Sequence, residues 1–151
     1  MRIRQRSLLL PLILIPAFST AKTQTKSTFD IDVNRAKFNY QMSCQGCHTP
    51  DGSGHKSVPK LKGFIGHFLT TQKGREYLIK VPGSANSALD DRQLAEVLNW
   101  MILSFGGAST PEQWRHYRPE EVHEYRKNPL FEVNDYRANL VKQIMNEPPP
   151  Q

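Results

Sequence analysis

Two cysteines, Cys44 and Cys47, stand three positions apart in a chain of 151 residues, and this pair limits what the chain can fold around. A disulfide between them would close a very small loop and would constrain the unfolded chain little. A structural zinc site would need four ligands, and the sequence has no second cysteine pair. The pair therefore needs another chemical explanation.

His48 follows the pair directly, so the segment reads Cys44-Gln45-Gly46-Cys47-His48, a c-type haem-attachment sequence. Each thiol adds to one vinyl group of the haem, and the imidazole then binds the iron. A helical turn through these residues places all three groups on one side. The motif occurs once. The sequence therefore predicts one haem c, attached covalently through Cys44 and Cys47, with His48 as the proximal iron ligand.

Residues around this motif form a wider pattern. Ala36 and Tyr40 stand eight and four positions before Cys44, Asp51-Gly52-Ser53-Gly54 follows as a turn, and Pro59-Lys60-Leu61-Lys62-Gly63 comes after it. In these features residues 32–105 resemble the class I c-type cytochromes.

The resemblance implies an all-α, cytochrome c-like domain around the haem, in which the first helix crosses the last. It further implies that the Pro59 carbonyl accepts a hydrogen bond from the Nδ1–H of His48, which fixes the ring tautomer. By the same resemblance, Tyr40 belongs to the helix crossing, and Trp100 packs near the haem.

Two longer helices are predicted in this domain, over residues 32–43 and 90–105. Asp90 and Gln93 fit a capping box at the start of the second. Its apolar residues recur at helical spacing, and two glycines follow it; the apolar residues are Leu94, Val97, Leu98, Met101, Ile102 and Phe105. Between the two helices, glycines and a proline indicate loops and one short helix over residues 76–79.

The sixth iron ligand is not evident, because the loop that usually supplies a methionine in class I cytochromes, here residues 81–89, contains neither Met nor His. Three side chains and a five-coordinate iron remain open. Met101 is a thioether on the apolar face of the last helix, or simply a core residue. Asn86 lies near the family's methionine position, or serves the turn. His67 would give a second imidazole, or bind a propionate at the surface.

Other candidates for the sixth ligand are weaker. His55 lies too close to the attachment motif, and Met42 stands only two residues before Cys44. Met145 belongs to the C-terminal extension. The nature of this ligand decides whether the haem suits electron transfer or binds small molecules.

A C-terminal extension, residues 108–151, exceeds what the haem domain of residues 32–107 needs. Helices are predicted over 119–127 and 135–145, and Thr110-Pro111 reads as a further helix start. His116 and His123 are interpreted as surface histidines. Either the extension wraps over the haem domain, or it is an arm that docks on a redox enzyme.

The chain opens with the pattern of an export signal. Three arginines among the first six residues precede an apolar run over residues 8–18, about half the length of a spanning helix. Ser19 and Ala21 suit cleavage after Ala21. We predict a signal peptide over residues 1–21, a flexible leader over 22–31, a periplasmic location and no membrane span after cleavage.

The basic charge is partly a property of that signal. The formal net charge is +6, and without the three arginines 17 basic residues face 14 acidic ones, a net charge of +3. Two haem propionates would lower it further. No block of like charge is present, so the sequence gives no support for a nucleic-acid partner.

These features favour a one-electron carrier over an enzyme, and no catalytic residue is predicted because no nucleophile and base stand at a recognisable spacing. The expected partners are redox proteins such as a periplasmic dehydrogenase or a terminal oxidase. Two alternatives stay open. One is a haem protein whose open sixth site binds or senses oxygen, carbon monoxide or nitric oxide, and the other is a cytochrome subunit of a redox complex.

Overall fold

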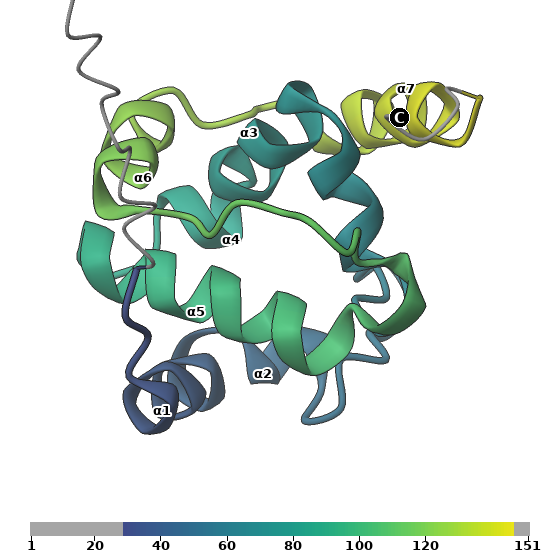
Figure 1. Cartoon of the computed structure of the whole chain (residues 1–151). Helices are drawn as coiled ribbons and strands as arrows, with labels where there is room; N and C mark the ends of the chain where they lie inside the picture. The colour runs from purple at the N-terminus through teal and green to yellow at the C-terminus, as the bar shows by residue number, and fades with distance from the viewer. Residues whose placement is uncertain (1–28, 147–151) are drawn as a thin grey trace, which may run out of the picture.

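The computed structural model describes residues 29–146, which fold into helices joined by loops (Figure 1). The elements are α1 (Val33–Ser43), α2 (Gln45–His48), the 3-10 helix η1 (Ile65–Thr70), α3 (Gln72–Lys80), α4 (Pro82–Ala85), α5 (Asp91–Phe105), the 3-10 helix η2 (Gly107–Ser109), α6 (Pro119–Arg126) and α7 (Val133–Asn146). Within the described range the β pairing is limited to one bridge, between His55 and Val58. The prediction of an all-α fold is confirmed.

Some sequence predictions fall on other parts of the chain. The predicted signal peptide (1–21) and most of the predicted leader (22–31) lie outside the described residues. Within residues 29–146, none of the helices combines the length and the apolar character needed to cross a membrane.

Helices α1 and α5 cross each other at the lower side of the view in Figure 1. Ala36 on α1 is fully buried, and its small side chain permits close approach of the two helices. Beside the crossing, the fully buried Glu96 on α5 accepts hydrogen bonds from Arg35 on α1 at 2.8 and 2.6 Å. Arg92 lies 3.3 Å from the same carboxylate. A buried carboxylate needs such partners, so this pair fixes how α1 lies on α5.

The start of α5 has the capping box that the sequence predicts. The Asp90 carboxylate accepts from the Gln93 amide N–H at 2.8 Å, and the Gln93 side chain accepts from the Asp90 amide at 3.0 Å. Helix α3 is longer than the predicted 76–79. It starts at Gln72 because the Thr71 hydroxyl caps it, accepting from the Gly74 amide at 3.0 Å.

The C-terminal extension packs over the rest of the fold. In Figure 1 it runs from the end of α5 back across the molecule to α6 and then to α7. Helix α6 lies against α3, α4 and α5, while α7 lies against η1 and α3. Val122 on α6 and Leu140 on α7 are buried in the common core. The wrapped arrangement is therefore the one observed.

The predicted helix start at Thr110-Pro111 is wrong, because residues 110–118 form no helix. Asn99 on α5 provides the backbone bonds that a helix would otherwise supply. Its amide nitrogen donates to the Tyr117 carbonyl at 2.9 Å, and its amide oxygen accepts from the Tyr117 N–H at 2.7 Å. Both residues are fully buried, so this bonding holds the segment extended along α5.

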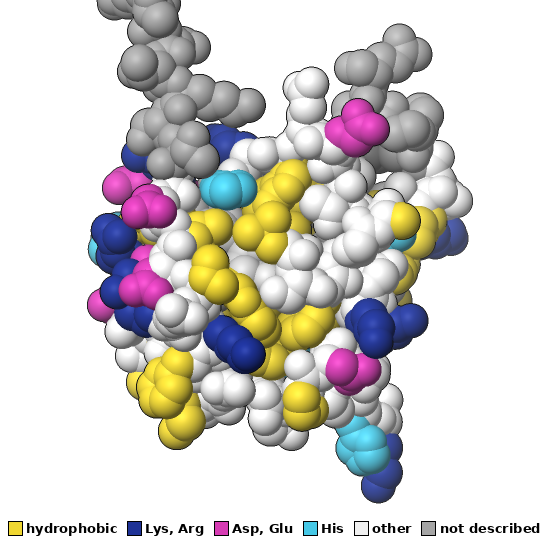
Figure 2. Space-filling view, turned by 60° about the horizontal axis from the view of Figure 1, so that its bottom comes forward, with side chains coloured by type: hydrophobic (Ala, Val, Ile, Leu, Met, Phe, Trp, Pro, Cys, Tyr) yellow, Lys and Arg dark blue, Asp and Glu magenta, His cyan; other side chains and the backbone are white. Residues whose placement is uncertain are grey.

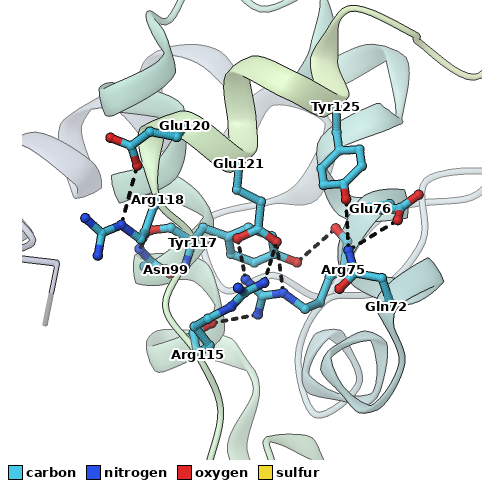
Figure 3. Close-up of polar contacts among 10 residues, drawn as sticks. All are labelled: Gln72, Arg75, Glu76, Asn99, Arg115, Tyr117, Arg118, Glu120, Glu121 and Tyr125. Atoms are coloured by element: carbon cyan, nitrogen blue, oxygen red, sulfur yellow. Dashed lines mark hydrogen bonds and ion pairs between the residues drawn. The ribbon is translucent and has the colours of Figure 1, made fainter. Parts of the chain in front are cut away.

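A buried ion pair fixes the extension to α3, as Figure 3 shows. Arg75 on α3 donates to both carboxylate oxygens of Glu121 on α6, at 3.0 and 2.8 Å, and to the Arg115 carbonyl at 2.6 Å. Its guanidinium carbon also lies 4.2 Å from the centre of the Tyr117 ring. The side chains of Arg75 and Glu121 are only 7% and 12% exposed, so each depends on the other for neutralisation.

Candidate haem-attachment site

The attachment turn, residues 44–48, follows directly on α1. Helix α1 ends at Ser43, and Cys44 serves both as its C-cap and as the N-cap of the single-turn helix α2. The Cys44 carbonyl accepts from the amides of Cys47 and His48 at 3.2 and 3.0 Å. One tight helical turn therefore carries both thiols and the imidazole, as the motif predicts.

The two thiols of this turn are free, with Cys44 half-buried against the core and Cys47 exposed. Burial, with a smaller contribution from Cys47, raises the pKa of Cys44 to about 11. Cys44 is therefore protonated at neutral pH, with no sign of an activated thiolate. A pair of unpaired, differently exposed thiols on one turn fits two thioether bonds to a ligand lying against the turn.

His48 is held in the orientation that metal binding requires. Its Nδ1 lies 3.3 Å from the Pro59 carbonyl, so Nδ1 carries the proton and Nε2 is the nitrogen available to a metal. Burial lowers the pKa of His48, although the bond to Pro59 opposes this. The ring is therefore neutral at neutral pH, which is the form that binds iron.

The loop after the turn is fixed by its own backbone. The Gly52 carbonyl accepts from the amides of Leu61 and Lys62 at 2.8 and 3.0 Å, and the Gly54 amide donates to the His48 carbonyl at 3.2 Å. Gly52 and Gly54 both have φ of +73°, a conformation that glycine adopts without strain. A Cβ on Gly52 would lie 2.9 Å from the Phe105 ring. This explains why the Asp-Gly-x-Gly turn needs its glycines.

Aromatic side chains join the turn to the helix crossing. The rings of Tyr40 and Trp100 lie 5.1 Å apart, and each lies close to Phe105, at 5.3 and 5.4 Å. The Tyr40 hydroxyl donates to the Thr49 carbonyl at 2.6 Å, just after His48. Tyr40 thus connects the α1–α5 crossing to the attachment turn.

The surface around α1 and α2 offers apolar area to a flat ligand. Figure 2 brings the lower side of Figure 1 forward, and a band of hydrophobic side chains crosses the middle of that face. Phe38 and Met42 on α1 are 59% and 70% exposed, and Leu103 on α5 is 59% exposed. Free thiols, a neutral oriented imidazole and an apolar surface are together the set that a haem needs.

The candidates for a sixth ligand lie in different surroundings. Met101 is buried in the core at 7% exposure, whereas Asn86 is exposed at the C-cap of α4. His67 is half-buried on η1, and its ring meets that of Phe64 edge-on at 5.3 Å. The weaker candidates Met42 and Met145 are 70% and 52% exposed. Their burial and local contacts do not single out one of them as the sixth ligand.

The histidines of the extension differ from each other. His123 is exposed as predicted, and its Nδ1 lies 2.9 Å from the Asp91 carboxylate. His116 is half-buried, with its ring 4.6 Å from that of Trp114, and its buried Nδ1 has no hydrogen-bond partner among the described residues. The interpretation of His116 as a surface histidine is therefore only partly right.

Sequence reasoning missed Arg126, which holds the loop 81–90 in place from the extension. Its guanidinium donates to the Ala85, Ser87 and Leu89 carbonyls at 2.8 to 3.2 Å and to Asp91 at 3.0 Å. These contacts span 35 to 41 residues of sequence. No local pattern distinguishes Arg126 from the other charged residues of α6, so nothing in the sequence could have identified it.

The helical fold and the Cys-x-x-Cys-His turn together are those of a small cytochrome. No family model matches the chain. Two relatives do, both named cytochrome c-552 and both from Thermus thermophilus. Each is 30% identical over 106 residues, a stretch that covers 58% of this chain and 81% or 72% of the relative. The chain belongs to the c-type cytochromes, whose haem is covalently bound.

The alignment also shows a difference in length. The aligned stretch counts 106 residues, but 58% of 151 residues is a smaller number. The relatives therefore have residues within the aligned stretch for which this chain has no counterpart.

Proposed function

We propose that this protein is an exported, class I-like monohaem cytochrome that carries single electrons between redox proteins. The haem is attached through Cys44 and Cys47, and His48 is its proximal iron ligand. The observation that carries the proposal is the hydrogen bond from Nδ1 of His48 to the Pro59 carbonyl, at 3.3 Å. His48 lies on the same turn as the two free thiols.

Bound haem supplies a one-electron couple between ferric and ferrous iron. The chain's own residues position it and set its surroundings. The Pro59 carbonyl fixes the His48 tautomer and raises the basicity of Nε2. Tyr40, Trp100 and Phe105 form an apolar aromatic group behind the turn, which limits water and disfavours the more highly charged oxidised site. Cys47 is exposed, so a haem held there would be open to a redox partner on that side.

Haem attachment is tested by expressing the chain with a cytochrome c maturation system. The wild type should retain haem after denaturation, with a pyridine haemochrome spectrum of two thioethers and one haem per chain. C47A should give a one-thioether spectrum, and H48A should lose most of the attached haem. H55A removes an exposed histidine seven residues away and should behave as the wild type. Unchanged haem content in H48A would contradict the assignment.

The export proposal rests on the sequence of residues 1–21. N-terminal sequencing of the protein recovered from the periplasm should begin at Lys22 if cleavage follows Ala21. Recovery of the uncut chain in the membrane fraction would contradict a cleaved signal.

A second candidate function is the binding of small ligands such as carbon monoxide or nitric oxide at an open sixth site. One observation favours it. The loop 81–90 lacks Met and His. Arg126 donates to three carbonyls of this loop. These bonds hold the loop and oppose a rearrangement that would supply the iron with a sixth ligand from it.

Spectra of the ferrous protein with and without carbon monoxide separate the two functions. A rapid change on adding carbon monoxide would favour ligand binding, whereas an unchanged low-spin spectrum would favour an electron carrier with a strong sixth ligand. In the second case M101L, which keeps the apolar volume, H67A and N86A should be compared. Loss of the low-spin spectrum in one of them identifies the ligand.

The physiological partner is proposed by class alone. A periplasmic dehydrogenase as donor and a terminal oxidase as acceptor fit an exported one-electron carrier, as does a place as subunit of a larger redox complex. Reduction of the purified cytochrome by a dehydrogenase encoded beside it would support the first. Co-purification with that enzyme at fixed stoichiometry would support the subunit role.

A further inference from the structure

A hollow of about 670 Å³ lies between the loop 53–60 and the first turns of α7. The loop supplies most of the lining, and Asn134, Arg137 and Ala138 on α7 supply the rest. It therefore exists only because the extension folds back against the loop that follows the attachment turn. Nothing in the proposed function uses this hollow.

The charge of the lining has one sign. Lys56, Lys60 and Arg137 contribute three cations, and none of the described residues that line the hollow carries a carboxylate. The nearby Asp51 is paired with Lys62 at 3.3 Å and lies outside the lining. Three cations facing one hollow repel each other, and an anion between them relieves that repulsion.

Arg137 is held as a wall of the hollow. Its guanidinium carbon lies 5.4 Å from the ring centre of Phe64, the N-cap of η1, and 5.9 Å from that of Phe68 on η1, so these two rings hold its charge in place. The lysines are exposed and can close on a ligand from the other side.

We propose that this hollow binds a small multivalent oxyanion, with inorganic phosphate and pyrophosphate as probes. Its volume exceeds that of one phosphate, so pyrophosphate, which offers more charge to the three cations, binds more tightly.

Two residues in the lining of the hollow form hydrogen bonds with His48, the proposed proximal ligand. Pro59, in its lining, accepts from Nδ1 of His48 at 3.3 Å, and Gly54, also in the lining, donates to the His48 carbonyl at 3.2 Å. An anion bound in the hollow would favour the oxidised haem, which carries one more positive charge than the reduced haem. This coupling rests on the proposed function, whereas anion binding itself does not. By linkage, threefold tighter binding to the oxidised form lowers the reduction potential by about 28 mV at saturation.

The test is calorimetry on the haem-loaded full-length protein at constant ionic strength. Wild type should bind one phosphate or pyrophosphate, the latter more tightly. K56Q/K60Q should weaken binding at least tenfold. The matched control K73Q/K142Q removes the same charge from exposed lysines outside the hollow and should stay within twofold of wild type. Equal weakening in both variants, or no saturable heat, overturns the site.

A further arm distinguishes the source of the anion. If a polyglutamate peptide binds while phosphate and pyrophosphate do not, the small-anion site is overturned and the cations serve an acidic protein partner instead. The haem content of the same sample is read from its pyridine haemochrome. A haem-free sample that binds phosphate contradicts the proposed function alone, and a haem-loaded sample that does not bind contradicts the hollow alone.

Discussion

The attachment segment, residues 44–63, and the loop 81–90 both consist of turns around one short helix, but they are held differently. The attachment segment is bonded largely within itself, with further bonds between Thr49 and Tyr40 and between Gly63 and Phe105. His48 contacts Pro59, Gly54 contacts His48, and the Gly52 carbonyl accepts from two amides nine and ten residues ahead. The loop 81–90 also has short-range bonds, within α4 and at Ser87, but its Ala85, Ser87 and Leu89 carbonyls in addition accept from Arg126, 37 to 41 residues away in sequence.

The difference indicates what each part depends on. A segment that satisfies its own backbone keeps its shape wherever its short sequence is kept. The loop 81–90 receives part of its bonding from the docked extension, and the extension is docked through Arg75, Asn99 and their partners. We infer that the extension is a structural part of the fold and not a free arm.

The largest effect is expected at the ion pair that docks the extension. Glu121→Met leaves Arg75 buried at 7% exposure without its carboxylate, and the free energy of unfolding should fall by about 3 kcal/mol. Chemical denaturation measures this. Hydrogen exchange should rise at the amides of the loop 81–90 and stay unchanged at those of the attachment segment.

The neighbouring position provides a matched control. Glu120 is on the same helix, and its ion pair with Arg118 is largely exposed, with side chains 75% and 47% accessible. Glu120→Met should change stability by no more than about 0.5 kcal/mol. Equal losses at the two positions would show that the pair with Arg75 is not what docks the extension.

The second effect is expected at Arg126 itself. Arg126→Met keeps an unbranched chain in place of the arginine stem but removes the bonds to the Ala85, Ser87 and Leu89 carbonyls, at a cost of about 2 kcal/mol. Exchange should accelerate at the amides of residues 81–90 while α6 stays folded. Lys127→Met, at the next, exposed position, should leave both readouts as in wild type. A loop that stays protected without Arg126 would contradict the comparison.

The same contrast explains what the sequence could and could not predict. The attachment turn and the capping box were predicted because short-range chemistry determines each one, and the glycine turn was implied by the family resemblance. The hydrogen bond between His48 and Pro59 was implied by the family resemblance and is present. The extended run 110–118 was mistaken for a helix start, because the bonding of Asn99 to Tyr117 crosses 18 residues and leaves no local pattern.

The sixth ligand stays open for a related reason. A proximal ligand is set by the turn that carries it, whereas the sixth position depends on which distant segment the fold brings over the iron. Met101, Asn86 and His67 come from three different elements, and no local rule ranks them. The extension adds a further long-range constraint through the loop 81–90.

The third prediction concerns the attachment segment. Gly54 has φ of +73°, and a Cβ there would lie 2.5 Å from the Val58 carbonyl oxygen, so Gly54→Ala should lower stability by about 1–2 kcal/mol. Exchange should rise near His48 and not in the loop 81–90. Gly83→Ala on α4, where nothing lies within 4 Å of the new Cβ, should change stability by less than about 0.5 kcal/mol. If hydrogen exchange in Gly54→Ala rises in both segments, the attachment segment and the loop 81–90 are not independent of each other.

The smallest expected effect separates the two kinds of contact that Arg126 makes, its hydrogen bonds to the loop carbonyls and its ion pair with Asp91. Partial burial opposes ionisation of Asp91, but hydrogen bonds from Arg126 and His123 outweigh it and hold the pKa of Asp91 below its ordinary value. A lowered carboxyl pKa stabilises the fold above the unfolded pKa of about 3.9, and the gain is lost as the pH falls through the folded value. Asp91→Asn should therefore cost less than about 1 kcal/mol at pH 7 and progressively less below pH 4.

Arg126→Met behaves differently if the loop carbonyls are its main partners, because carbonyls do not titrate. Most of its cost should then persist at pH 3, where that of Asp91→Asn has diminished. Denaturant titrations of both variants at pH 7 and pH 3 measure this, with Glu124→Gln as a control that removes an exposed carboxylate from α6. If the cost of Arg126→Met instead disappears at pH 3, the extension holds α5 through Asp91, and the loop 81–90 is fixed by its own short-range bonds after all.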